Sequence, residues 1–309
     1  MAPFVLPPPL ALAAPVTELP AATTGLWEAK LDGWRGSALT GPGSRVWSRR
    51  GTDLSTAFAD IAGALSQLPE AVVDGEIIAL DAHGNLVFSK LQTRARGPRR
   101  GEDFTVHFAV FDLLALGDTD WRGRRYLERR AEVERLLADA PASIRPMPAT
   151  ADRAAALRWV GGLGGGVEGL VVKPDLPYRE NHRSGWQKWR RTHTVEAVIV
   201  GVTQAAAPQQ AFVLAQPIRG RLRPVGVTLP IPGPLRAEVA PLLRPAGPIA
   251  ELPGTVGGLP GAPSIAYLPV EPTVVLEIEA DQAAPTEFSR FRHRPRAIRR
   301  RAELTPADL

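Results

Sequence analysis

The chain contains lysine at only four positions, 30, 90, 173 and 188, while its other basic residues are arginine. A lysine amine can lose its proton and act as a nucleophile, whereas an arginine guanidinium stays protonated in proteins. Lys30 lies in WEAKLDGWRG (27–36), between Glu28 and Asp32 and shortly before Arg35. This pattern allows covalent catalysis by Lys30. The alternative is a solvated charge that escaped the arginine-rich composition by chance.

Three further segments combine charged residues with short apolar runs: DGE (74–76), EGLVVK (168–173) and WQKWRR (186–191). Taken singly, they are explained by a turn, by the charged ends of a core strand and by a polar sheet face. Strict strand alternation predicts that Glu168 and Lys173 lie on opposite faces, and that Lys188 and Arg190 share one face. The glycine-rich GGLGGG (161–166) lacks the lysine of a P-loop and is interpreted as a linker.

The composition indicates a globular protein with no cysteine chemistry. The chain has 309 residues, of which 44% are hydrophobic, enough for two domains or one large one. The absence of cysteine excludes disulfides and zinc thiolates. A net charge of +5 permits a polyanionic partner without requiring one. The apolar start lacks a basic n-region, and no run reaches the ~18–20 apolar residues of a membrane span, so we expect a cytoplasmic protein.

Hydrophobic periodicity divides the chain near residue 192. Residues 1–25 are rich in proline and alanine and are expected to be irregular. Within 26–192, the patterns predict short strands from residue 26 onward, strands at 71–80, 107–116 and 167–174, and helices at 54–68, 126–139 and 151–160. Within 193–309 they predict strands at 193–203, 212–215, 222–229 and 274–280, a helix near 235–243, a loop at 244–264 and a basic segment at 288–301. The second part is therefore β-rich and of a size typical of a small barrel.

The charged segments occur in a recognisable order. K-x-D-G at Lys30 is followed by S-R-x-G (48–51), D-G-E, V-F-D-L-L (110–114), E-G-L-V-V-K and W-x-K-W-R. This ordered set resembles the covalent nucleotidyltransferase superfamily of ATP-dependent DNA ligases, RNA ligases and mRNA capping enzymes. The amino-acid sequences of these motifs are most similar to those of small bacterial ligases of the ligase C and ligase D kind. The resemblance covers residues 26–203 and implies an α+β fold, in which an adenylation domain of antiparallel sheets with helices precedes a smaller OB-fold β-barrel.

The resemblance also implies a role for each matching residue. Lys30 corresponds to the nucleophile that forms a lysyl-adenylate. The remaining matches are Glu28 and Phe111 at the adenine, Arg35 and Arg49 at the ribose or the 5′-phosphate of the nick, Glu76 at the ribose or a metal, Glu168 at the metal, and Lys173 and Lys188 at the α-phosphate, with Arg190 beside them. Lys90 matches no family position.

The implied reaction joins a nick in duplex DNA with ATP as substrate and Mg²⁺ or Mn²⁺ as cofactor. The implied partners are nicked double-stranded DNA and proteins of DNA repair or end joining, and the implied state is a monomer. One departure is the family's C-terminal R-x-D-K, which has no lysine here. Either Arg296, Arg299 or Arg300 replaces that lysine, or the adenylation step is slow. The alternatives left open are an RNA ligase, a capping-type guanylyltransferase and a non-catalytic module that binds DNA ends.

Overall fold

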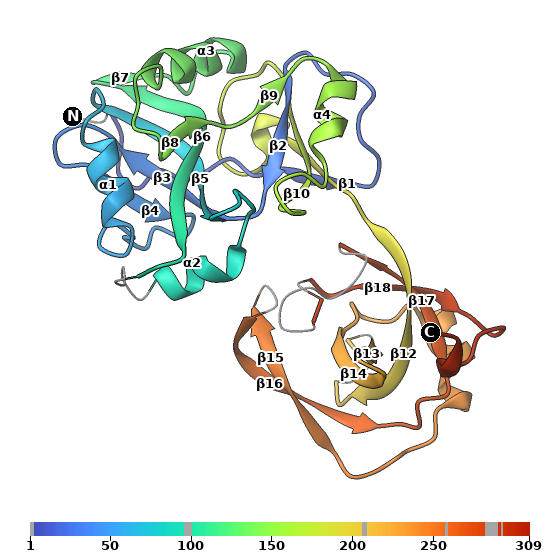
Figure 1. Cartoon of the computed structure of the whole chain (residues 1–309). Helices are drawn as coiled ribbons and strands as arrows, with labels where there is room; N and C mark the ends of the chain where they lie inside the picture. The colour runs from blue at the N-terminus through green and yellow to red at the C-terminus, as the bar shows by residue number, and fades with distance from the viewer. Residues whose placement is uncertain (1–2, 96–100, 206–208, 257–258, 282–289, 292) are drawn as a thin grey trace. The chain divides into compact units, whose positions relative to one another are not determined.

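The computed structural model describes residues 3–95, 101–205, 209–256, 259–281, 290–291 and 293–309. The chain forms two compact units, Met1–Arg191 and Thr192–Leu309, and each is described by itself (Figure 1). In the part of the chain that the structure describes, every helix is too short or too polar to cross a membrane.

The first unit is built from two sheets. The five-stranded sheet has the order β1 (Ala14–Val16), β11 (Gln187–Arg190), β10 (Val167–Lys173), β2 (Leu26–Leu31) and β9 (Ala149–Thr150). Its strands are antiparallel except that β1 runs parallel to β11. The six-stranded sheet has the order β4 (Arg45–Ser48), β3 (Trp34–Leu39), β5 (Ala71–Asp81), β6 (Phe104–Leu116) and β7 (Thr119–Asp120), with β8 (Ile144–Pro146) parallel to β6.

The alternation of side chains on β6 gives the six-stranded sheet two apolar faces. Phe108 and Val110 pack in the cluster that includes residues of α1 (Ala59–Leu65), α2 (Phe88–Arg94) and α3 (Tyr126–Leu136). Ala109 and Phe111 instead pack with Ala29 and Leu31 of the five-stranded sheet. Figure 1 shows the three helices beside β3–β6. The remaining helices are α4 (Arg153–Trp159), which packs on β2 and β10, and the 3-10 turn His182–Ser184.

Two expectations for the first unit need correction. The segment 1–25 is not wholly irregular, because β1 adds a parallel strand to the edge of β11. The helix expected over 54–68 is limited to Ala59–Leu65. Its expected first turn is tied to β4 instead, since the Ser55 hydroxyl accepts a hydrogen bond from the Val46 N–H at 3.0 Å. The Ser55 N–H also donates to Asp53 Oδ1 at 2.8 Å, and such local side-chain bonds compete with helical ones.

The second unit is a sheet of seven described strands centred on β12 (His193–Thr203). Neighbouring strands are all antiparallel, in the order β14 (Arg221–Val227), β13 (Phe212–Ile218), β12, β16 (Leu259–Pro269) and β15 (Ala250–Val256), while β17 (Val275–Ala280) pairs with both β12 and β18 (Arg296–Arg300). The short helix α5 (Gly233–Val239), the 3-10 turn Ala240–Leu242 and a last one at Pro306–Asp308 complete the unit.

The stretch 244–264 is not a loop, because it contains β15 and most of its partner β16. Its proline and glycine content suggested a turn-rich segment, but β15 lies at the edge of the sheet, where Pro253 needs no partner for its nitrogen. Register shifts around Gly254 take up the irregularity. The basic segment 288–301 likewise ends in a paired strand, β18, while its residues 288–289 and 292 lie outside the described residues.

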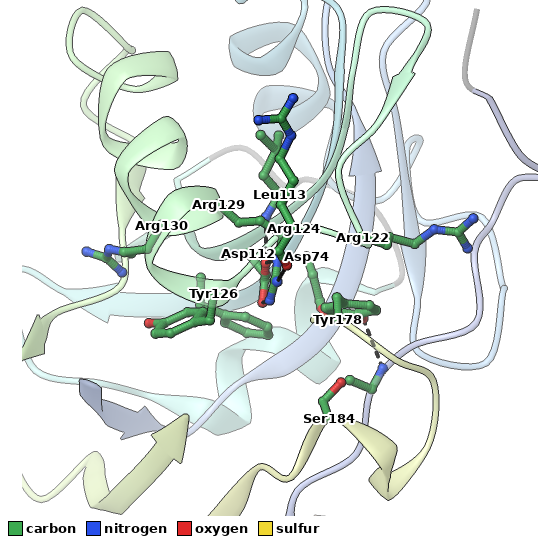
Figure 2. Close-up of polar contacts among 12 residues, drawn as sticks. Asp74, Asp112, Leu113, Arg122, Arg124, Tyr126, Arg129, Arg130, Tyr178 and Ser184 are labelled. Atoms are coloured by element: carbon green, nitrogen blue, oxygen red, sulfur yellow. Dashed lines mark hydrogen bonds and ion pairs between the residues drawn. The ribbon is translucent and has the colours of Figure 1, made fainter. Parts of the chain in front are cut away.

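A fully buried ion pair fastens α3 to the six-stranded sheet (Figure 2). Arg129 donates to both carboxylate oxygens of Asp112, at 2.7 and 3.1 Å, and both side chains have 0% exposure. Arg129 Nη1 also donates to the carbonyls of Arg124 and Leu176, at 2.5 and 3.1 Å. Every charge here is satisfied only while α3, β6 and the segment after β10 stay together.

Replacing Arg129 with alanine should therefore destabilise the first unit by about 3–5 kcal/mol, because Asp112 would remain as an unpaired buried charge. All seven tryptophans lie in the first unit, so urea unfolding followed by tryptophan fluorescence measures that unit alone. The matched control is Arg135→Ala on the exposed surface of α3, which should cost less than about 1 kcal/mol. Equal losses in the two variants would contradict the assignment.

Candidate active site

The pairing of β2 with β10 brings Lys30 against a carboxylate. Lys30 lies opposite Gly169, and the register shifts by one residue between Val167 and Gly169, so that Glu168 is the extra residue of a bulge. The Lys30 Nζ lies 2.5 Å from Glu168 Oε2. Both side chains remain partly accessible, with 16% and 10% exposure. The candidate nucleophile is thus held in place while it can still reach a ligand.

The bulge corrects the prediction that Glu168 and Lys173 lie on opposite faces. One face of β2 carries every second residue, namely Leu26, Glu28 and Lys30. Leu26 pairs with Lys173, so Lys173 lies on this face as well. The extra residue returns Glu168 to that face, where it meets Lys30. Gly169 permits the close approach of β11 here, because an added Cβ would lie 2.1 Å from the Trp189 carbonyl oxygen.

Glu28 and Lys173 form a buried pair beside this face. Lys173 Nζ lies 2.8 Å from Glu28 Oε2, and the side chains are only 1% and 2% exposed. The hydroxyl of Tyr126 donates to Glu28 Oε1 at 2.5 Å, and Arg130 lies 3.7 Å from the same oxygen. Burial raises the pKa of Glu28 and lowers the pKa of Lys173, and the attraction between the two charges opposes both shifts.

Aromatic rings enclose the Lys173 amine. It lies 4.1 Å from the centroid of Phe111 and 4.0 Å from that of Trp186, and it donates to the Phe111 carbonyl at 3.0 Å. Cations favour such positions over aromatic faces. Lys188 lies on the adjacent strand β11, opposite Val171 and two residues away from Lys173 in the register. In this arrangement the Lys173 side chain is buried between Glu28, Phe111 and Trp186.

Arg35 and Glu76 face each other across β3 and β5 of the six-stranded sheet. Arg35 is held by Asp74, with Nε and Nη2 donating to its carboxylate at 3.1 and 2.7 Å. Burial raises the pKa of Glu76 to about 7, although the positive charges of Lys30 and Arg35 partly oppose that shift. Glu76 is therefore a carboxylate whose charge the folded protein stabilises poorly without a further cation.

The cationic members of the site gather around Lys188 on β11. Burial lowers the pKa of Lys188, and the positive charges of Arg190, Lys30, Arg49 and Arg35 lower it further. Arg190 Nε also lies 3.4 Å from Glu168 Oε2, and the exposed Arg49 follows β4, with its backbone N–H donating to the Arg35 carbonyl at 2.9 Å. A group of cations that repel one another favours an anionic ligand such as a phosphate.

The donor set fits a hard divalent cation. Glu168 and Glu76 supply carboxylate oxygens, which Mg²⁺ and Mn²⁺ prefer. The raised pKa of Glu76, caused first by its burial, shows a carboxylate that a bound cation would stabilise in its charged form.

Four residues of the site had no role in the sequence analysis. Tyr126 contacts Glu28, Asp74 holds Arg35, Tyr178 donates to Asp74 at 2.8 Å, and Trp186 covers Lys173. The aspartate of D-G-E and the tryptophan of WQKWRR were both in view as parts of motifs. Nothing in the spacing pointed to the two tyrosines, because their partners lie 98 and 104 residues away in the sequence.

A family model for the ATP-dependent DNA ligase domain matches residues 11–190, more than half of the chain. This protein belongs to the ATP-dependent DNA ligase family. Its first unit accordingly has the antiparallel sheets and few helices of a ligase nucleotidyltransferase fold. The residues grouped above all fall within the matched segment.

Three ligases illustrate the relationship. DNA ligase C of Mycobacterium tuberculosis is 30% identical over 338 residues, covering 98% of this chain and 92% of that protein. DNA ligase C2 of Mycolicibacterium smegmatis is 38% identical over 210 residues, covering 64% and 58%. LigD of M. tuberculosis, named a multifunctional non-homologous end joining DNA repair protein, is 33% identical over 180 residues, covering 57% and 22%. The crystal structure of its ligase domain matches with a TM-score of 0.51 and 25% identity over 97% of each chain.

The raised pKa of Glu76 predicts a pH dependence of stability. The folded protein binds a proton at Glu76 up to a pH of about 7, whereas the unfolded chain releases it near 4.5. Stability from this group is therefore fully present below pH 4.5 and falls as the pH rises toward 7. In metal-free protein, the difference in melting temperature between Glu76→Gln and the parent should grow in favour of the variant from pH 5 to 7.5. A difference in melting temperature that stays constant between pH 5 and 7.5 would contradict the assignment. The control is Glu128→Gln, on the exposed surface.

Proposed function

We propose that this protein is an ATP-dependent DNA ligase that seals nicks in duplex DNA through a lysyl-adenylate. The observation that carries the proposal is the position of the Lys30 amine. It contacts Glu168, lies within the electrostatic reach of Lys188, and shares its strand face with Glu28. A candidate nucleophile, a group of cations and a cluster of buried aromatic rings thus occur together.

The reaction consists of three displacements at phosphorus. The neutral amine of Lys30 attacks the α-phosphorus of ATP, a nitrogen–phosphorus bond forms, and the bond to pyrophosphate breaks. The 5′-phosphate of the nick then attacks the same phosphorus and releases Lys30. Finally the 3′-hydroxyl attacks the 5′-phosphate, and AMP leaves. Such transfers depend mainly on positioning and on neutralisation of charge.

The residues of the site divide these tasks. Phe111 and Glu28 form the adenine end of the pocket, and Lys173 fixes both through its ion pair and its contact with the Phe111 carbonyl. Arg35 and Arg49 serve the ribose or the 5′-phosphate of the nick, and Glu76 serves the ribose or a metal. Lys188 and Arg190 neutralise the α-phosphate. We also propose that Lys173 contacts the α-phosphate, as the resemblance implies.

Glu168 and Glu76 are the residues that would hold Mg²⁺ or Mn²⁺. Such a cation supplies positive charge to the phosphate oxygens. Glu168 accepts a hydrogen bond from the Lys30 amine and so orients it. The amine must lose a proton to solvent or substrate before it can attack.

We further propose that residues 26–192 are the adenylation domain and that residues 193–309 form an OB-fold domain with a basic C-terminal segment. A small antiparallel β unit with a short helix supports this assignment. The expected partner is nicked double-stranded DNA, bound by a monomer in the cytoplasm. The name of LigD supports a role in DNA repair together with end-joining proteins.

Incubation with α-labelled ATP tests the nucleophile. The parent should form a stable adenylate that maps to Lys30, whereas Lys30→Ala should show no label and Lys30→Arg should show none either, since a guanidinium has no free amine to attack. Transfer of the label to a nicked duplex and sealing complete the test. Label from GTP alone would favour the capping reaction, sealing restricted to RNA would favour an RNA ligase, and binding without label would favour an end-binding module.

The arginines that stand in place of the missing C-terminal lysine can be compared directly. Arg299 is paired with Glu277 at 2.6 Å, whereas Arg296 is exposed and carries no ion pair among the described residues. Truncation would remove β18, so point variants are the sharper test. We expect Arg296→Ala together with Arg300→Ala to slow adenylation by about tenfold or more, and Arg299→Ala to have a smaller effect. Unchanged rates of pyrophosphate release in the double variant would rule out this role.

A further inference from the structure

The N-terminal segment lies against the site. Residues 4–16, here called the strap, place the buried Leu10 and Ala11 in the apolar cluster that contains Phe111, Tyr178 and Trp186. The partly buried apolar residues that pack on the same cluster include Phe4, Leu6 and Ala13. The strap therefore covers the side of the cluster whose other members enclose Lys173.

Hydrogen bonds fix the strap to the segment that leads into β11. The Leu12 N–H donates to the Asn181 carbonyl at 2.5 Å, and the Ala14 N–H donates to the Trp186 carbonyl at 2.8 Å. β1 then continues beside β11, with Pro15 opposite Lys188. The strap is thus the outer neighbour of the strand that carries Lys188 and Arg190.

A second connection runs from the strap to Arg35 through one hydroxyl group. The Ala11 N–H donates to the Tyr178 hydroxyl at 2.9 Å, and that hydroxyl donates to Asp74 Oδ2 at 2.8 Å. Asp74 Oδ2 also accepts from Arg35 Nη2 at 2.7 Å. Figure 2 shows Tyr178 and Asp74 next to each other. Every group in this series of hydrogen bonds belongs to a buried residue, except the guanidinium of Arg35.

The geometry leaves the Tyr178 hydroxyl a single orientation. Because it accepts from Ala11, its proton points to Asp74 Oδ2, which also accepts from Arg35 Nη2, while Asp74 Oδ1 accepts from Arg35 Nε. The ring of Tyr178 also packs edge-on against Trp186, with 5.6 Å between centroids, and Arg35 lies 5.5 Å from the Trp186 ring. The position of Arg35 is therefore defined by contacts that begin in the strap.

We infer that the strap is a positioning element of the ligase site, and that Tyr178 transmits its position through Asp74 to Arg35. The inference rests on the proposed function, in which Arg35 holds the nucleotide or the 5′-phosphate of the nick. The strap makes no bond to the ligand. It sets the orientation of a guanidinium whose planar, two-pronged geometry makes binding sensitive to small rotations.

A double-mutant cycle separates positioning from simple stabilisation. In the Lys30→Ala background, which prevents turnover, the dissociation constants of ATP and of a nicked duplex are measured for Tyr178→Phe, Arg35→Lys and the double variant. Tyr178→Phe keeps the ring and removes the hydroxyl. It should raise the dissociation constant of the same ligand that Arg35→Lys affects. The expected increase is about fivefold, which corresponds to the loss of one hydrogen bond. In the double variant the two effects should not add, because Tyr178 acts through Arg35.

The strap itself is tested by a matched pair of prolines. Ala14→Pro removes the N–H that donates to the Trp186 carbonyl, whereas the Ala13 N–H donates to no backbone carbonyl in the described part of the chain. Edge strands accept proline where no ladder bond is lost. Ala14→Pro should therefore weaken binding of the same ligand severalfold, and Ala13→Pro should not. Tyr267→Phe, in the second unit, is the control for loss of a tyrosine hydroxyl.

Each outcome bears on the inference. If the effects of Tyr178→Phe and Arg35→Lys add, the strap does not act through Arg35 and the inference is wrong. A lowered melting temperature with unchanged dissociation constants would also contradict it, because the strap would then only stabilise the fold. No weakening of either ligand by Arg35→Lys would also overturn it. The parent protein's labelling with ATP decides the proposed function separately, because it depends on Lys30 and does not require the strap variants.

Discussion

The pairing of β2 with β10 is the constraint on which the site depends. It sets Lys30 against Gly169 and leaves Glu168 as the extra residue of a bulge, so that the candidate nucleophile meets a carboxylate 138 residues away in the sequence. The same register places Glu28 near Lys173. Because neighbouring positions on one strand alternate between faces, a shift of one residue would separate both pairs at once.

The site lies between the two sheets of the first unit, and each sheet supplies a different kind of group. The five-stranded sheet carries Lys30, Glu168 and Lys188, to which we assign the phosphate and the metal in the proposed function. The six-stranded sheet carries Arg35, Glu76 and Phe111. The hydrogen bond from Lys173 to the Phe111 carbonyl and the strap both join the two sheets. A ligand between them is therefore positioned from both sides.

Burial gives several of these groups their chemical character. Glu76 loses water and holds its proton up to a pH of about 7, while Glu28 and Lys173 accept burial because they face each other. The cluster around Lys188 contains mutually repelling cations, and a phosphate relieves that repulsion.

The sequence by itself determined the family and proposed the candidate site, because the order of K-x-D-G, D-G-E, E-G-L-V-V-K and W-x-K-W-R is a property of the chain alone. Local patterns also located most strands and α3. Only the tertiary structure decided the face of Glu168, the burial of Lys173, the pairing within 244–264 and the contact of the strap with Tyr178. Each depends on a bulge, a sheet edge or a partner distant in the chain, and residue spacing contains no record of those.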